Sequence, residues 1–187
     1  MGLPFVVRPA GVDELTEGDP VAVAAENASR KALAVSADSL LGPENASRKA
    51  LAAPADGLVL GADTLVAVDG AILGKPADAA QARDYVGRLA GRTHEVVGGI
   101  ALARDGAVVA AAVEVTEVRF RELSAADVAA YVETGEWQGR AGGYAIQGRG
   151  AALVRGISGD YLNVVGLPLA RLLDLLPERP LQRVFGA

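Results

Sequence analysis

The sequence predicts an α/β fold in which helices pack on one mixed, twisted β-sheet. Segments with helical periodicity alternate along the chain with segments of strand character, and tight-turn signals join several of the strands. Half of the 187 residues are apolar (51%) but only 4% are aromatic, and small side chains suit close helix–sheet packing. The length favours one domain, which we expect to span residues 1–187.

The first strands surround a hairpin signal. Thr64–Val68 and Ala71–Leu73 flank Asp69-Gly70, a dipeptide that tolerates the positive φ angles of a two-residue turn. A short apolar run, Leu58–Leu60, precedes them. These residues predict a β-hairpin.

The rest of the chain continues the alternation. Asp78–Ala90 predicts a helix with apolar residues on one face, followed by long strands at Glu95–Ala103 and Ala107–Phe120. Ser124-Ala-Ala-Asp127 has the pattern of a capping box and predicts the start of a second helix. Pro168 predicts the start of a last helix, rich in leucine.

An internal repeat lies near the N-terminus. Glu26–Ala34 recurs letter for letter as Glu44–Ala52. A solenoid needs about three or more copies to bury a shared core, so two copies favour a local tandem duplication within a helix–loop region. The Asn-Ala-Ser sequon in each copy is interpreted as a chance match.

Composition excludes several classes of function. A net charge of −5 argues against general nucleic-acid binding, and no apolar run reaches the ~20 residues that cross a membrane. Without cysteine there are no disulfides or thiolate metal sites, which suits a reducing cytoplasm. His94 is the only histidine, so a divalent cation would need oxygen ligands, as Mg²⁺ or Mn²⁺ prefer.

Polar residues interrupt the apolar elements at candidate sites. Asp63 and Thr64 follow the first apolar run, where α/β sheets commonly place ligands, although aspartate is also an ordinary turn residue. The hairpin brings Lys75 back toward Asp63, where it could hold a phosphate or remain a solvated turn lysine. Glu14 is a second carboxylate that could share a divalent cation with Asp63.

A third cluster is rich in glycine. Ala141–Gly148 contains paired glycines, which let backbone N–H groups approach an anion or a base, and Gln147 can both donate and accept hydrogen bonds to a pyrimidine edge. Glycine-rich turns between short strands are the alternative interpretation.

In order and spacing these pieces closely resemble the Maf family of nucleoside triphosphate pyrophosphatases. The matching stretches cover nearly the whole chain from Leu3 onward: Gly11–Glu14, Arg30–Ala32 or its copy, Val59–Thr64, Gly74–Pro76, Gly91–Val97, Ala141–Gly148, Gly159–Tyr161 and Val164–Leu169. The resemblance implies hydrolysis of the α–β phosphoanhydride bond of altered or surplus nucleotides, a house-cleaning activity that uses a divalent metal. It also implies a homodimer, and the cysteine-free composition leads us to expect a cytoplasmic protein.

The resemblance assigns roles by position. Asp63 is expected to orient or deprotonate the attacking water, with Glu14 as the supporting acid and Lys75 facing a phosphate. Asp63 and Glu14 are the candidate metal ligands. Thr64 after Asp63, together with Tyr144-Ala-Ile-Gln147, is similar to the branch that prefers dTTP and UTP, and Thr64 and Gln147 are the expected substrate-binding residues.

The chain departs from the family pattern in three places. Family members begin with a strand and a Ser-x-Ser-Pro-Arg-Arg loop for the triphosphate, and both are expected to be missing before Gly2–Val7. The repeat leaves two candidates for the substrate-facing lysine. Counting forward from Glu14 puts Lys31 at the position expected from the family, and counting back from Asp63 puts Lys49 there. Gly98 stands where the family usually has threonine, which would loosen a strand near the site.

Two other functions remain open at this point. A catalytically impaired chain would bind a nucleotide and act as a regulator in septum formation, and the missing loop favours this alternative. An enzyme for deaminated purines such as ITP is the other alternative, against which the Gly61–Thr64 and Gly142–Gln147 patterns argue. His94 lies in a family motif, and we expect a hydrogen-bonding residue at a strand edge rather than a catalyst.

Overall fold

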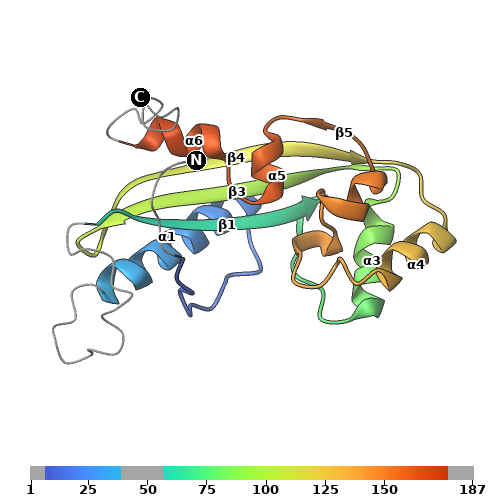
Figure 1. Cartoon of the computed structure of the whole chain (residues 1–187), viewed down its shortest axis with the longest axis horizontal. Coiled ribbons are helices and arrows are strands. Elements are labelled where there is room, and N and C mark those ends of the chain that lie inside the picture. Colours follow the sequence, from blue (N-terminus) through green and yellow to red (C-terminus); the bar gives the residue numbers. More distant parts are fainter. Residues whose placement is uncertain (1–6, 39–56, 177–187) are drawn as a thin grey trace.

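The computed structural model describes residues 7–38 and 57–176, whose strands form one five-stranded sheet (Figure 1). The strand order is β2-β1-β3-β4-β5. The strands are β1 (Val59–Val68), β2 (Ala71–Leu73), β3 (Thr93–Arg104), β4 (Ala107–Phe120) and β5 (Val154–Ser158). The predicted hairpin and the two long strands are therefore confirmed.

The α/β class with helices on one sheet is confirmed, but the expectation of mixed strand directions is wrong for the described strands. All four neighbouring pairs are antiparallel. The hairpin at Asp69-Gly70 reverses the chain after β1, and a helix, α3 (Ala79–Leu89), then returns it so that β3 runs antiparallel beside β1. A helix between two strands of the sequence therefore does not imply parallel neighbours here.

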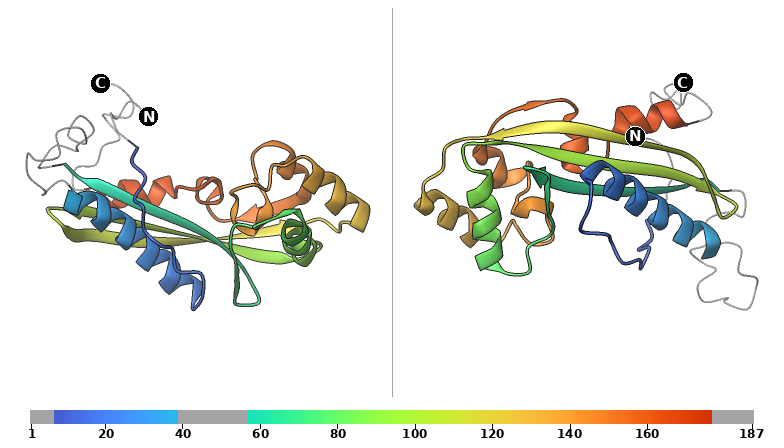
Figure 2. Two further views of the ribbon diagram at one scale, coloured as in Figure 1. Left: turned by 90° about the horizontal axis from the view of Figure 1, so that it is seen from below. Right: turned by 180° about the vertical axis from the view of Figure 1, so that it is seen from behind.

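Helices cover both faces of the sheet. In the left view of Figure 2, α1 lies on one face and the C-terminal helices α5 and α6 lie on the other. The helices α3 and α4 pack together at one end of the sheet. Besides α3, the helical segments are α1 (Pro20–Asp38), α4 (Ala125–Glu133), α5 (Tyr161–Val165), α6 (Leu169–Leu175) and the 3₁₀ turns η1 (Ala141–Gly143) and η2 (Gly148–Leu153).

Helix α1 approaches the sheet unusually closely because small residues line the contact. Its start is set by Asp19, whose carboxylate accepts a hydrogen bond from the Ala22 N–H, and by Pro20 at the first position. One helix face presents alanines spaced four residues apart, and all three are fully buried: Ala24, Ala28 and Ala32. Beneath them β1 has Gly61 and β3 has Gly99, where any Cβ atom would overlap the α1 backbone. These glycines set how near α1 can lie.

We expect Gly61→Ala to destabilise the fold by about 1–3 kcal/mol, because the added methyl group must push α1 away from β1. Urea unfolding measures the change. Gly87→Ala is the matched control, since a Cβ there meets nothing within 4 Å and alanine is the better helix former by about 0.5–1 kcal/mol. Equal effects of the two substitutions would contradict this account of the packing.

The opposite face is fixed by a buried amide. Asn163 of α5 is fully buried and donates hydrogen bonds to the Val96 carbonyl oxygen (3.0 Å) and to the Thr116 hydroxyl (3.1 Å). Gly98, the residue that stands where threonine was expected, lies directly under Asn163 Oδ1, and a Cβ atom there would overlap that oxygen. Gly98 therefore allows α5 to lie against the sheet, rather than only loosening β3.

The large apolar core lies at the α3–α4 end. It includes Phe120, Tyr131 and Trp137, and the Trp137 indole N–H donates to the Val132 carbonyl oxygen at 3.0 Å. The capping box predicted at Ser124 and Asp127 is present at the start of α4. The two 3₁₀ turns η1 and η2 pack on this core through Ala141 and Leu153.

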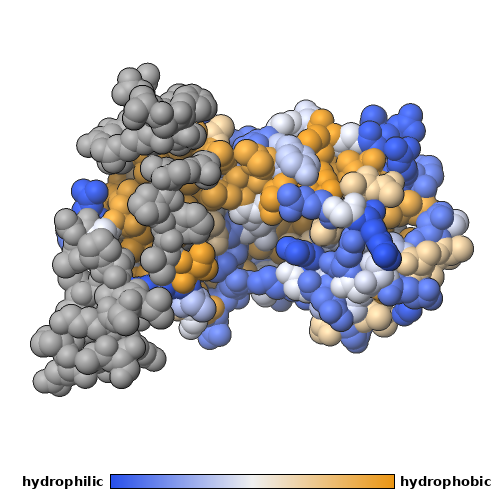
Figure 3. Space-filling model, viewed as in Figure 1, coloured by the Kyte–Doolittle hydropathy of each residue, from blue (hydrophilic) through white to orange (hydrophobic). Residues whose placement is uncertain are grey.

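Apolar side chains also remain on the surface. Figure 3 shows them gathered over α5 and beside β5, and the exposed residues there are Ile157, Tyr161, Leu162 and Val165. Within the described ranges, no helix is both long and apolar enough to span a bilayer.

Candidate active site

A cleft of about 310 Å³ opens along one edge of β1. Strand β2 pairs with β1 only from Val66 to Val68, so the described structure has no strand beside Asp63 and Thr64 on that edge. Neighbouring residues of a strand point to opposite faces, and a cleft at the strand edge can reach both of them. Six of the predicted site residues line this cleft: Glu14, Lys31, Asp63, Thr64, Lys75 and Gln147.

Asp63 lies at the centre of the polar contacts. It is 7% exposed and shares a sheet face with Gly61, so it points toward α1. Its Oδ1 accepts a hydrogen bond from Lys31 Nζ at 2.6 Å, and its Oδ2 accepts one from Asn27 Nδ2 at 2.9 Å. Both carboxylate oxygens are thereby held in a fixed direction.

Asn27 is a site residue that sequence reasoning missed. It is 1% exposed, and its amide exchanges hydrogen bonds with the backbone of Leu15: Leu15 N donates to Oδ1 (2.8 Å), and Nδ2 donates to the Leu15 carbonyl oxygen (3.0 Å). Asn27 thus ties the segment that carries Glu14 to α1 and to Asp63. The signal was present, because Asn27 and Lys31 are four residues apart and therefore share one helix face.

Lys31 joins the two acids. Its Nζ lies 2.8 Å from Glu14 Oε1 as well as 2.6 Å from Asp63 Oδ1. Burial lowers the pKa of Lys31, but hydrogen bonds and charge from Asp63 and Glu14 outweigh it and raise that pKa. Burial by itself raises the pKa of Glu14. The ammonium groups of Lys31 and Lys75 outweigh burial, so the pKa of Glu14 is lowered overall. We therefore expect Lys31 to be charged and Glu14 to be ionised near neutral pH.

Lys75 and the glycine-rich segment form the other wall. Lys75 Nζ lies 3.1 Å from Glu14 Oε2, so this lysine reaches Glu14, while Lys31 contacts Asp63. Gly142 N donates to the Gly74 carbonyl oxygen at 3.0 Å, which fastens η1 to the segment that carries Lys75. Gly142 has a φ of 67°, and a Cβ there would press on Val66 of β1.

The remaining candidates lie around this centre. The Thr64 hydroxyl is 3.4 Å from the Gly166 carbonyl oxygen, which connects β1 to the end of α5. Gln147 is exposed and lines the cleft just before η2. Lys49 and its copy of the repeat lie outside the described residues. Of the two candidate lysines, the structure places Lys31 at Asp63.

His94 serves the core behind the cleft. It is 2% exposed on the central strand β3, rather than at a sheet edge, and its Nε2 lies 2.8 Å from the Tyr144 hydroxyl, so a hydrogen-bonding role is confirmed. The rings of His94, Phe120 and Tyr144 meet edge to face. Tyr144 lines the cleft, so this aromatic cluster supports one of its walls.

Burial lowers the pKa of His94 to about 4, which predicts loss of stability in mild acid. The unfolded chain gains this proton as the pH falls through about 6.5, whereas the folded chain stays neutral until about 4. Stability is therefore present above pH 6.5 and declines toward pH 4, by about 2 kcal/mol between pH 7.5 and pH 5. Urea unfolding at these two pH values tests this. In His94→Gln the free energy of unfolding should fall by about 2 kcal/mol less between these two pH values than in the wild-type chain. The same fall in both proteins would contradict the role given to His94.

The chain is similar in sequence to known proteins over most of its length. A family model described as Maf-like protein matches residues 1–179. A protein of Symbiobacterium thermophilum named dTTP/UTP pyrophosphatase is 47% identical over 180 residues, covering 95% of this chain and 84% of the relative. One of Pyrococcus furiosus with the same name is 40% identical, covering 97% and 88%. One of Xylella fastidiosa, named nucleoside triphosphate pyrophosphatase, is 48% identical, covering 63% and 62%.

Proposed function

Because this chain belongs to the Maf family, we propose that it hydrolyses nucleoside triphosphates, preferably dTTP and UTP, to nucleoside monophosphate and pyrophosphate. The names of the two relatives that match over most of their length support the pyrimidine preference. The proposal places this activity in the cytoplasm, as a means of removing surplus nucleotides.

One observation carries the proposal. A buried carboxylate, Asp63, is held at both oxygens, and Lys31 joins it to Glu14 at the edge of an open cleft. A general base needs a fixed direction toward the proton that it removes, and a phosphate chain needs cations beside it. Asn27 and Lys31 supply the first of these requirements, while Lys31 and Lys75 supply the second.

The steps follow from these residues. Asp63 accepts a proton from a water molecule, and the water oxygen bonds to the α-phosphorus. The bond from that phosphorus to the α–β bridging oxygen breaks, and pyrophosphate leaves with the bonding electrons. Lys31 and Lys75 offset the charge that develops on the phosphate oxygens. Glu14 holds both lysines toward the substrate, and Thr64 and Gln147 bind the nucleoside.

The donor set suits a divalent metal that enters with the substrate. Among residues 7–38 and 57–176, no group of three or more histidine, cysteine, aspartate or glutamate side chains gathers at one place. Mg²⁺ is commonly held by one or two carboxylates plus substrate phosphates, and Asp63 and Glu14 offer such a pair. When bound, Mg²⁺ or Mn²⁺ would neutralise phosphate charge. Lys31 contacts both carboxylates in the described structure. A metal that entered with the substrate would therefore share Asp63 and Glu14 with Lys31.

A substrate panel tests the proposal. The purified chain is given dTTP, UTP, CTP, ITP and GTP with Mg²⁺ or Mn²⁺, and phosphorus NMR identifies the products. We expect monophosphate and pyrophosphate, formed fastest from dTTP and UTP, and no turnover once EDTA removes the metal. Preference for ITP would instead support a deaminated-purine enzyme. Binding of dTTP without turnover would support the regulatory alternative.

The assembly proposed for this enzyme is a homodimer. The exposed apolar residues over α5 and β5 support it, because surface patches of this kind often mark protein contacts. Light scattering on the purified chain tests the dimer, and a monomer at micromolar concentration would argue against it.

A further inference from the structure

We infer that Arg140 binds the phosphate chain of the substrate. Arg140 lies in the cleft wall just before η1 and was not among the residues singled out by sequence. This inference rests on the proposed function, because it identifies another contact to the same nucleotide.

The charge balance of the cleft points to Arg140. Two acids, Glu14 and Asp63, and three cations, Lys31, Lys75 and Arg140, line the cleft. Both lysines are paired with these acids. Within the described part of the chain, the Arg140 guanidinium forms no ion pair or hydrogen bond, and the residue is exposed. Of the three cations that line the cleft, Arg140 is therefore the one that forms no ion pair with a carboxylate of the described residues.

The backbone of Arg140 is fixed although its side chain is free. Its N–H donates to the Trp137 carbonyl oxygen at 3.1 Å, and its own carbonyl oxygen accepts from Gly143 N at 3.0 Å. Trp137 is buried and anchored to α4. Two residues later, the hydrogen bond from Gly142 to Gly74 fastens the segment beside Lys75. The guanidinium thus extends into the cleft wall from a backbone that is fixed on both sides and is hydrogen-bonded to the residue before Lys75.

A guanidinium suits this ligand. It presents parallel N–H groups that can bond two phosphate oxygens at once. A triphosphate carries several negative charges, whereas the two lysines are already shared with carboxylates. Arg140 adds a positive charge that is not shared with Asp63 or Glu14.

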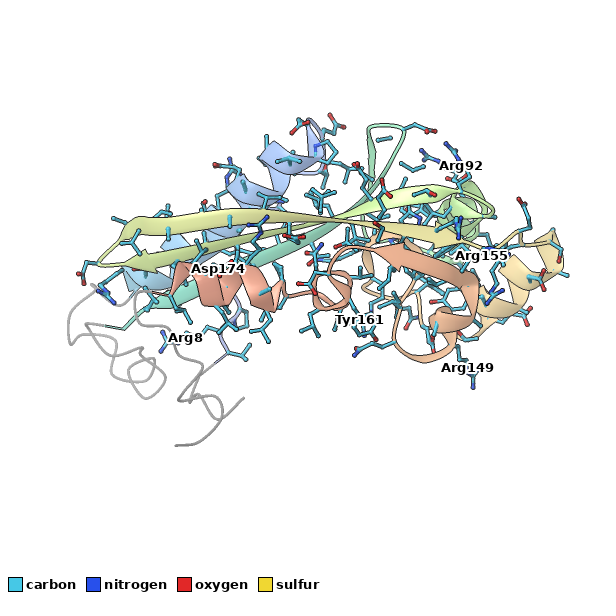
Figure 4. All side chains as sticks on the ribbon, turned by 90° about the horizontal axis from the view of Figure 1, so that it is seen from above. Arg8, Arg92, Arg149, Arg155, Tyr161 and Asp174 are labelled. Atoms are coloured by element: carbon cyan, nitrogen blue, oxygen red, sulfur yellow. The ribbon has the colours of Figure 1, made fainter. Side chains whose placement is uncertain are left out.

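Binding of α,β-imido-dUTP, which the chain cannot cleave at that bond, tests this inference without turnover. For Arg140→Gln we expect the dissociation constant to rise about 10- to 100-fold, the range of a lost hydrogen-bonded charge contact. Arg140→Lys should recover part of the loss, because it keeps the charge without the two-pronged geometry. Arg155→Gln is the control: this exposed arginine lies on β5, outside the cleft lining (Figure 4).

The outcomes separate this inference from the proposed function. A phosphate contact also predicts equal proportional increases in KM for dTTP and UTP, and weaker pyrophosphate inhibition in Arg140→Gln. Unchanged analogue binding, or a loss confined to one base, would overturn the role of Arg140 even if the wild-type chain hydrolyses dTTP. If the wild-type chain binds the analogue but cleaves no nucleotide, the proposed function fails while the Arg140 comparison still stands.

Discussion

Asp63→Asn is expected to slow pyrophosphate release by about a hundred- to ten-thousand-fold, the usual contribution of a positioned general base. The asparagine side chain has nearly the same shape but cannot take the proton from water. Its amide also cannot accept at both ends, so either Lys31 or Asn27 would meet a donor instead of an acceptor. The initial rate with saturating dTTP measures the effect.

A matched control separates catalysis from general damage. Asp69→Asn makes the same chemical change in the exposed hairpin after β1, at a residue with a φ of 52° that asparagine tolerates. We expect full activity from Asp69→Asn, and circular dichroism shows whether each variant is folded. A folded Asp63→Asn protein that keeps most of its rate would refute the role proposed for Asp63.

The strands and helix starts were predictable because their signals are local. The Asp69-Gly70 turn and the Ser124 capping box depend on residues within a few positions of one another, and both occur in the structure. Strand direction was not predictable in this way. It depends on which strands become neighbours, and a hairpin followed by a helix placed β3 antiparallel to β1. Short elements such as β5 and α5 were missed because their glycine-rich surroundings also fit turns.

Candidate site residues were predictable where their chemistry is conspicuous. Asp63 is a charged residue directly after an apolar run, and Glu14 and Lys31 were identified by their positions in the family pattern. The structure brings the three together. Asn27 was overlooked because its amide is uncharged and its Asn-Ala-Ser context suggested only a chance sequon. Its importance comes from Leu15 and Asp63, which are far from it in sequence and reach it only in the fold.

The internal repeat allows a matched pair of substitutions, because Lys31 and Lys49 lie in identical nine-residue sequences, Glu26–Ala34 and Glu44–Ala52. We expect Lys31→Met to lower kcat/KM for dTTP by about 100- to 1,000-fold, the usual cost of removing one preorganised electrostatic group from a reaction centre. Without this ammonium, Asp63 keeps only its Asn27 contact and Glu14 keeps only Lys75. The two carboxylates then lose the cation between them.

Lys49→Met is the matched variant, with the same residue change in the same local sequence. We expect it to leave kcat/KM within about twofold of the wild-type value, a difference of at most about 0.4 kcal/mol. Lys31→Arg adds a further comparison, since it keeps the charge but cannot place a single nitrogen against both acids as Nζ does. The reverse ranking, with Lys49→Met inactive and Lys31→Met active, would mean that the second copy of the repeat supplies the lysine at the reaction centre. Because only one lysine can occupy the space between Glu14 and Asp63, the ranking also tells which copy is the surplus one.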